Sequence, residues 1–178
     1  DGDLRPILRY PHRKEDDLKG AVMVYQAPYR NALGQVPHNL YYICHDPYGQ
    51  DQSSDGSSLG AAYVMKRANN ISQPDDMIVA SYIGRPHSQD EYNRNLFMLA
   101  DYYNAKIGFE NDRGNVIGYA RQHRKFHRLQ EEFEMLDKKE LASSKVNRNY
   151  GMHMTTPRKL QGEIYIRDWL NTKRSKKE

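Results

Sequence analysis

The stretch "LYYICHDPYG", residues 40–49, predicts a strand that ends on a carboxylate. Residues 40–46 are rich in tyrosine and isoleucine, which favour β-structure. Asp46 closes this run, and the Pro-Tyr-Gly that follows it is typical of a turn. Two interpretations are open at this point. Asp46 starts an ordinary surface turn, or its side chain is exposed at a strand end because it binds a metal ion.

Two more strands are predicted after this turn. Residues 47–58 have the composition of a loop, and strand-like residues return at 59–66 and again at 77–83. Three successive strands with short connections are typical of an antiparallel meander. The sequence therefore predicts that the sheet begins as such a meander.

A helix is predicted next, at residues 88–104. Ser88 and Glu91 have the spacing of a capping box at the start of a helix. The apolar positions recur at helical spacing, so one face of the helix is predicted to be buried. The residues on that face are Tyr92, Leu96, Leu99 and Tyr103.

A short strand at residues 105–110 ends on a second carboxylate, Glu110, and another helix is predicted to begin near Asn115. A helix crossover can return a strand parallel to one already in the sheet. If that neighbour is the first strand, Asp46 and Glu110 end adjacent parallel strands about 4.8 Å apart. Sites in open α/β sheets gather at such strand ends. The order of elements thus predicts an α/β fold with a mixed sheet and a site at these two acids.

The two ends of the chain carry weaker patterns. Residues 1–37 are predicted to form an N-terminal arm or hairpin extension with a strand within 21–29, and residues 38–178 to form the main domain. Residues 160–171 are predicted to be helical and to be followed by a basic tail. Near-helical spacing predicts one further helix through Phe126, Leu129, Phe133 and Leu136.

The composition limits the classes of protein to which the chain can belong. Its 178 residues suit one domain, and its mean hydropathy of −0.96 indicates a polar globular chain. No apolar run approaches the roughly 20 residues of a membrane span, and no signal peptide is present, so neither membrane association nor secretion is expected. Cys44 is the single cysteine and is expected to be a packed apolar side chain. The missing initiator Met predicts a piece of a longer protein.

Several catalytic motifs are absent from the sequence. The seven histidines form no HExxH motif and no Cys/His set, and His45 is expected to pack rather than to act in catalysis. Neither a Walker A loop nor a serine nucleophile elbow is present. The segment "DQSSDG" (51–56) resembles half of an EF-hand loop, but Ala62 stands where that loop needs Glu. Zinc, P-loop and calcium chemistry are therefore not expected.

Basic residues favour a polyanionic partner. The formal net charge is +4 and the isoelectric point is about 9.0. The segment "RQHRKFHR" (121–128) would place four basic residues on one face of a helix, either to contact phosphates or as a solvated surface. Two more basic residues stand near a predicted helix start at 155–162. The candidate nucleic-acid-binding residues are Arg121, Arg124, Lys125, Arg128, Arg158 and Lys159.

Asp46 and Glu110 are the candidate catalytic and metal-binding residues. Hard cations such as Mg²⁺ and Mn²⁺ prefer carboxylate oxygens and keep several waters. Two such ions about 3.5–4 Å apart can activate a water and stabilise the leaving oxygen of a phosphodiester. The spacing in the sequence does not by itself distinguish this role from that of turn residues.

Several motifs, in order, resemble the nuclease domain of the terminase large subunits of tailed bacteriophages. They are "DPYG" (46–49), "ASYIGRP" (80–86), "LADYYN" (99–104), "IGFEN" (107–111) and "GMHMTTPRKLQG" (151–162). The resemblance covers roughly residues 38–165. It implies a ribonuclease-H-like mixed sheet, with three antiparallel strands followed by parallel ones and flanked by helices. Asp46 and Glu110 match the family's first-strand and fourth-strand acids.

The resemblance also implies a function and partners. It implies an endonuclease that uses two Mg²⁺ or Mn²⁺ ions to cut concatemeric viral double-stranded DNA during genome packaging in the cytoplasm of the bacterial host. An ATPase motor domain would precede the nuclease, and a small terminase subunit and a portal would be partners. The family has a third acid near the C-terminus. Asp168 has unlike surroundings, so that ligand is expected beyond residue 178, from a domain truncated at its C-terminus.

Three alternatives remain at the level of the sequence. The chain can be a non-catalytic module that binds DNA or docks on a motor, in which case its acids are turn residues. It can be another ribonuclease-H-like nuclease, such as a junction resolvase. A glycosidase with two carboxylates ranks last, because it explains neither the basic residues nor the order of strands.

Overall fold

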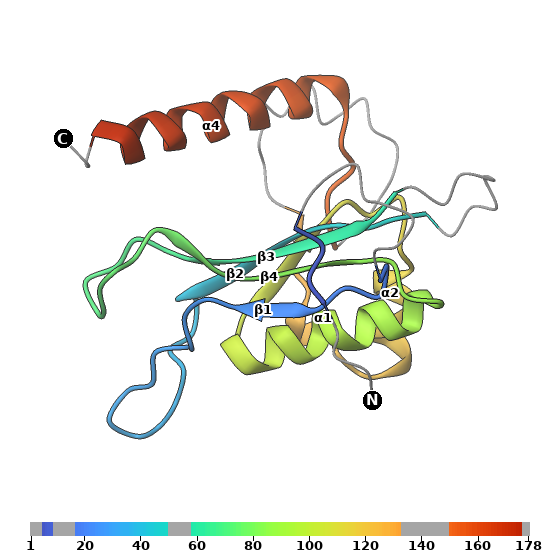
Figure 1. Ribbon diagram of the computed structural model, residues 1–178, viewed down its shortest axis with the longest axis horizontal. Helices are drawn as coiled ribbons and strands as arrows, with labels where there is room; N and C mark the ends of the chain where they lie inside the picture. The colour runs from blue at the N-terminus through green and yellow to red at the C-terminus, as the bar shows by residue number, and fades with distance from the viewer. Residues whose placement is uncertain (1–4, 9–16, 50–57, 133–149, 176–178) are drawn as a thin grey trace.

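The computed structural model describes residues 5–8, 17–49, 58–132 and 150–175. From residue 41 its elements are three strands, a helix, a strand and a helix, as the sequence predicts, and Figure 1 labels them along the chain. The strands are β1 (Val22–Val24), β2 (Tyr41–Asp46), β3 (Gly60–Lys66), β4 (Met77–Gly84) and β5 (Lys106–Phe109). The helices are α1 (Gln89–Tyr103), α2 (Val116–Gln122), the 3-10 helix η1 (Phe126–Arg128) and α4 (Thr156–Ser175).

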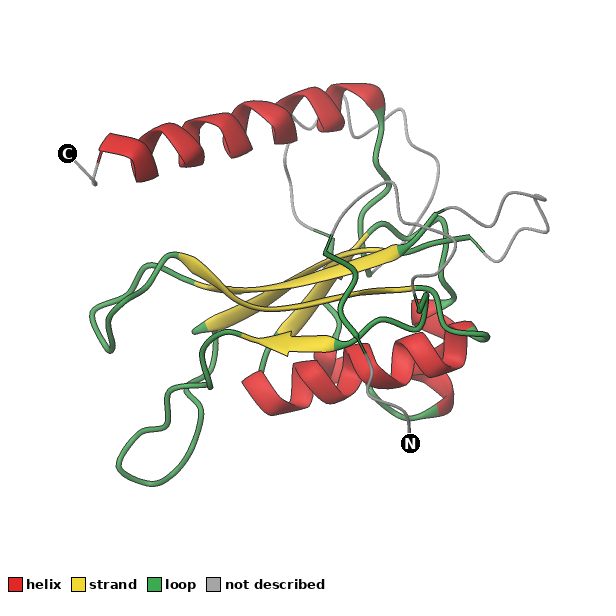
Figure 2. Cartoon of the chain, viewed as in Figure 1, coloured by secondary structure: helices red, strands yellow, loops and turns green. Residues whose placement is uncertain are grey.

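The described strands form one mixed sheet in the order β1-β4-β3-β2-β5. The pairs β2–β3 and β3–β4 are antiparallel, which confirms the predicted meander. β5 pairs parallel with β2, so the strand after α1 returns beside the first strand of the meander. The protein is therefore an α/β protein with a five-stranded mixed sheet flanked by helices (Figure 2).

α1 covers one face of the sheet. The side chain of Ser88 caps the helix by accepting a hydrogen bond of 3.1 Å from the Glu91 amide, as the capping box predicts. The helix ends at Asn104, whose φ of 49° lies in the left-handed region. The predicted apolar face is buried, and Leu96 and Tyr103 are both 0% exposed. α1 and the strands β2 to β5 thus enclose the main core.

α4 lies on the opposite side of the sheet from α1 (Figure 1). It is longer than the predicted helix at 160–171, since it begins at Thr156 and continues to Ser175. Much of its apolar surface is not buried: Leu160 is 57% exposed and Ile166 is 62% exposed. The sheet is therefore packed tightly on one face and loosely covered on the other. None of the helices in the described part is long and apolar enough to cross a membrane.

The predictions for the two ends of the chain needed changes. The strand predicted within residues 21–29 has only three residues, and it pairs with β4 at the sheet edge instead of forming a hairpin within the arm. The helix predicted through Phe126 and Leu129 is wrong over the described residues. Leu129 is extended and forms a parallel bridge to Ile107, because the chain there joins the edge of the sheet beside β5. Residues 133 and 136, also in that prediction, lie outside the described residues.

Candidate active site

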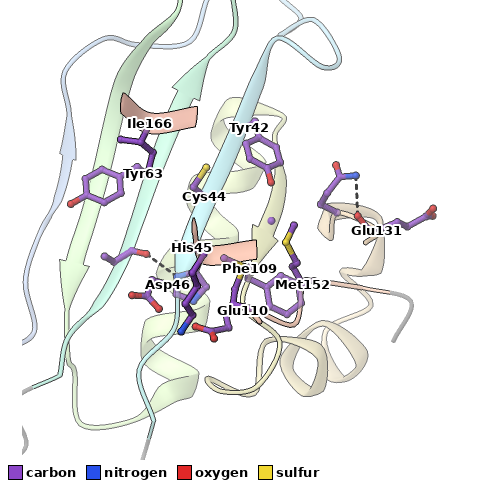
Figure 3. Close-up of a pocket in the computed structure, with 16 residues that line it drawn as sticks. Tyr42, Cys44, His45, Asp46, Tyr63, Phe109, Glu110, Glu131, Met152 and Ile166 are labelled. Carbon is purple, nitrogen blue, oxygen red and sulfur yellow. Dashed lines mark hydrogen bonds between the residues drawn. The ribbon is translucent and has the colours of Figure 1, made fainter. Parts of the chain in front are cut away.

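Asp46 and Glu110 lie at the carboxyl ends of two neighbouring parallel strands. The register of β2 and β5 pairs Cys44 with Gly108 and His45 with Phe109. Continuing this register by one residue places Glu110 beside Asp46. Figure 3 shows their side chains at the same end of one pocket. The predicted juxtaposition of the two acids is thus present.

The alternation of side chains along β2 decides which face carries the acids. Tyr41, Ile43 and His45 are 2%, 0% and 5% exposed and point toward α1. Successive side chains of a strand point to opposite faces, so Cys44 and Asp46 point toward α4. Both of these residues are exposed. Glu110 directly follows β5 and continues its register beside Asp46, so its side chain points to the same face, where it is half-buried.

The chain after each acid is fixed by packing. Gly114 follows Glu110 in a tight turn and has a φ of +78°, and an added Cβ there would lie 2.4 Å from Cβ of Pro47. The turn after Glu110 therefore packs against the proline that follows Asp46. The Asn93 side chain of α1 donates a hydrogen bond of 2.9 Å to the Gly114 carbonyl. These contacts hold the two strand ends close together on a rigid base.

A pocket of about 590 Å³ lies between the sheet and α4 and includes both acids. This volume falls within the roughly 300–1,000 Å³ of typical small-molecule sites. Most of its other side chains are apolar, but Glu131 is a third acid of the lining and Lys159 of α4 is a basic residue in it. The lining residues are Tyr42, Cys44, His45, Asp46, Ala61, Tyr63, Gly108, Phe109, Glu110, Gln130, Glu131, Gly151, Met152, Met154, Lys159 and Ile166.

The pair of acids offers the oxygen ligands that a hard cation needs. Mg²⁺ is usually held by one or two protein carboxylates and keeps several waters, so Asp46 and Glu110 fit one such ion. Within the described ranges, however, no group of three or more His, Cys, Asp or Glu residues could hold a metal. Asp168 is 65% exposed on α4 and is not among the residues that line this pocket. A site for two ions would therefore need ligands from outside the described residues.

The predicted basic helical face is not formed. α2 ends at Gln122, and Arg124 has a left-handed φ of 55°, so the four basic residues do not share one helix. Lys125 and Arg128 both bind the carboxylate of Asp101, at 2.6 and 2.8 Å. Burial raises the pKa of Asp101, but the hydrogen bonds and charges of these two residues outweigh it and lower that pKa. Arg121 and Arg124 remain exposed.

Arg158 and Lys159 have different surroundings although they are neighbours in sequence. Arg158 is 3% exposed and donates hydrogen bonds to a carboxylate oxygen of Glu132, at 2.9 Å, and to the His153 carbonyl, at 2.8 Å. It holds the start of α4 in place and is not free to contact a phosphate in this arrangement, which corrects the prediction. Lys159 is exposed and lines the pocket with the two acids.

His45 packs against α1, as the sequence analysis expects. Its ring stacks on Tyr92 with centroids 5.3 Å apart, and its Nδ1–H donates a hydrogen bond of 3.1 Å to the Ala61 carbonyl. Because a carbonyl only accepts, the neutral ring carries its proton on Nδ1. The buried Nε2 has no hydrogen-bond partner within the described part of the chain. Burial lowers the pKa of His45 to about 4, so the ring stays neutral at physiological pH.

The aromatic and thioether wall of the pocket was missed by the sequence analysis. Tyr42, Tyr63 and Met152 contribute to it from three separate segments (Figure 3). One signal was available: residues 41–44 are apolar on both faces of the strand, which indicates a strand covered on both sides. The partners of Tyr42 across the pocket could not be inferred, because Met152 is far away in sequence.

Comparisons with known proteins do not identify the chain. No protein-family model matches it, and no curated protein matches it in sequence. The interpretation of the site therefore depends on its geometry and on the motifs in the sequence.

Proposed function

We propose that the protein is a metal-dependent DNA endonuclease with a ribonuclease-H-like fold. One observation carries this proposal: Asp46 and Glu110 lie side by side at the carboxyl ends of β2 and β5, on the face that opens to a pocket. Two-metal phosphodiester hydrolysis needs carboxylates on rigid elements, and this pair would supply two of them. The antiparallel meander followed by a parallel strand is compatible with a ribonuclease-H-like sheet.

In this proposal Asp46 and Glu110 hold Mg²⁺ or Mn²⁺. Bound as a pair, such ions supply an activated water and stabilise the leaving oxygen of the phosphodiester. A further carboxylate from outside the described residues completes the ligand set. The exposed side chains of Lys159, Arg121 and Arg124 neutralise phosphates of the DNA, and the affinity for DNA therefore falls as salt rises.

The biological setting of the proposal comes from the motifs that resemble terminase nuclease domains. By that resemblance, the substrate is concatemeric viral double-stranded DNA, and cutting accompanies genome packaging in the cytoplasm of the bacterial host. An ATPase motor domain in the longer protein, a small terminase subunit and a portal are the corresponding partners.

Cleavage of supercoiled plasmid in Mn²⁺ tests the proposed activity. We expect Asp46→Asn and Glu110→Gln each to abolish nicking, because each removes a charged metal ligand. Both variants should unfold at the same temperature as the parent or higher, since two adjacent negative charges repel. The matched controls are Asp168→Asn and Glu163→Gln, two exposed acids of α4 outside the pocket lining. Nicking that survives in the Asp46 and Glu110 variants would refute the proposal.

A second candidate function is a non-catalytic DNA-binding or motor-docking module. It is favoured by the finding that, within the described residues, no group of three or more His, Cys, Asp or Glu side chains could hold a metal ion. This candidate predicts that DNA binding weakens on charge reversal at the exposed Arg124 and does not respond to Mn²⁺. Titration of Mn²⁺ by calorimetry separates the two functions: heat of binding that disappears in Asp46→Asn supports the nuclease.

A further inference from the structure

We propose that the pocket beside the two acids binds a single unpaired nucleobase, so that the preferred substrate is DNA with a frayed or single-stranded segment. This inference rests on the proposed nuclease function for the identity of its ligand. It assigns an occupant to the apolar part of the pocket, which a two-metal site alone does not use.

The walls of the pocket suit a flat, apolar ring. Tyr63 of β3, 37% exposed, and Ile166 of α4, 62% exposed, border one side, and Tyr42 and Met152 border the other (Figure 3). Between them lies Cys44, whose exposed side chain is small enough to leave the centre of the pocket open. Aromatic side chains bind bases of any sequence, because every base has a π-face.

The apolar walls of the pocket lie next to charged residues, where the phosphate of a bound nucleotide would be placed. Asp46 and Glu110 form part of the same lining, so an occupant lies directly beside the metal-binding acids. Lys159 adds a positive charge to the lining, which complements the phosphate of the nucleotide that carries the base. An apolar ring with a negative charge at one end is the chemistry that this combination recognises.

The size of the pocket allows a single base to enter and excludes a duplex. About 590 Å³ accommodates a nucleotide and is far too small for two paired strands. A base must therefore leave the stack before it enters. The energetic cost of leaving the stack is lowest for a base that is already unpaired. This selects frayed ends, flaps and gaps over intact duplex.

Fluorescence of 2-aminopurine tests the pocket directly. Single-stranded oligonucleotides would carry one 2-aminopurine at successive positions, and binding would be followed in EDTA by the anisotropy of a terminal dye, so that no cleavage occurs. The parent protein should quench 2-aminopurine at one position, because stacking quenches its emission. Tyr63→Leu should lose the quench, and its single-strand affinity should fall about tenfold, within the roughly 5- to 150-fold expected for loss of base stacking. Duplex affinity should stay unchanged.

Two further variants make the result unambiguous. Cys44→Leu narrows the pocket with a bulkier aliphatic side chain while it keeps every tyrosine, and it should abolish the quench as Tyr63→Leu does. Tyr102→Leu changes a 43% exposed tyrosine of α1, on the other side of the sheet, and should leave the quench intact. Thermal unfolding of each variant shows that the fold is kept.

The outcomes separate this inference from the nuclease proposal. The base pocket is overturned if the oligonucleotide binds without a quench at any position. It is also overturned if Tyr63→Leu and Cys44→Leu both keep the quench of the parent protein, whatever the plasmid assay shows. A quench that persists in Asp46→Asn, and disappears in both pocket variants, supports it even where nicking fails.

Discussion

The two faces of strand β2 have opposite properties. On the side of α1, Ile43 is 0% exposed and His45 is 5% exposed, within a core of close aromatic contacts. On the side of α4, Cys44 and Asp46 are exposed, and a pocket separates them from the helix. One face supplies the apolar burial that stabilises the fold, and the other leaves apolar and charged groups open to a ligand. Substitutions at neighbouring residues of β2 should therefore affect stability on one face and ligand binding on the other.

The largest expected difference in the free energy of unfolding is between the variants Ile43→Ala and Cys44→Ala. Ile43→Ala removes buried methylene and methyl groups from the α1 face and should lower the free energy of unfolding by about 2–5 kcal/mol. Cys44→Ala removes an exposed thiol and should change it by less than about 1 kcal/mol. Urea denaturation of both variants measures the two values. Equal losses would show that the α4 face is as important for stability as the core.

Acidification should lower the free energy of unfolding, because His45 is buried in the core on the α1 side of the sheet. Burial lowers the pKa of His45 to about 4. Above its ordinary value near 6.5 the ring is neutral in both states, so the full stability is present. Between pH 6.5 and 4 only the unfolded chain binds the proton, and the free energy of unfolding falls by about 3 kcal/mol in total.

The pH dependence of His45→Phe isolates this contribution. Carboxylates also titrate in this range, so the quantity to compare is the difference between the parent protein and the variant from pH 7 to pH 4. The variant should lose about 3 kcal/mol less than the parent over that range. The same slope in both proteins would mean that His45 is accessible to protons in the native state.

The smallest expected difference in stability is between substitutions of Arg158 and Lys159, two neighbouring residues at the start of α4. Arg158→Ala removes a buried side chain that binds Glu132 and the His153 carbonyl, and should cost about 2 kcal/mol with little change in DNA affinity. Lys159→Ala should leave stability within about 0.5 kcal/mol and weaken DNA binding. Thermal unfolding and filter binding at two salt concentrations measure both. A larger loss of affinity in the Arg158 variant would contradict the assignment.

The sequence was most informative where local pattern and topology agree. The Tyr- and Ile-rich run and the turn after Asp46 predict a strand that ends on an acid, and the helical spacing from Tyr92 to Tyr103 predicts the crossover. Together they lead to the parallel neighbour of β2 and thus to Glu110. The length of α1 was also close to the predicted one, because capping by Ser88 and the left-handed Asn104 define its two ends locally.

The sequence was least informative where tertiary contacts decide. Nothing in "RQHRK" signals a break, yet the chain turns at Arg124, and Lys125 and Arg128 bind Asp101 of α1. Adjacent basic residues likewise do not reveal that Arg158 is buried and Lys159 exposed. The pocket wall combines β2, β3, α4 and the segment around Met152, so no single stretch of sequence contains its pattern.

The parallel pairing of β2 with β5 also determines when the two acids meet. β2 has its antiparallel neighbour as soon as β3 is made, but β5 can join only after β4 and α1 have been synthesised and the crossover has formed. Pairings between distant segments are the slow steps of folding. A chain still emerging from the ribosome therefore carries Asp46 without its companion. Any reaction that needs both side chains can therefore begin only after β5 has paired with β2.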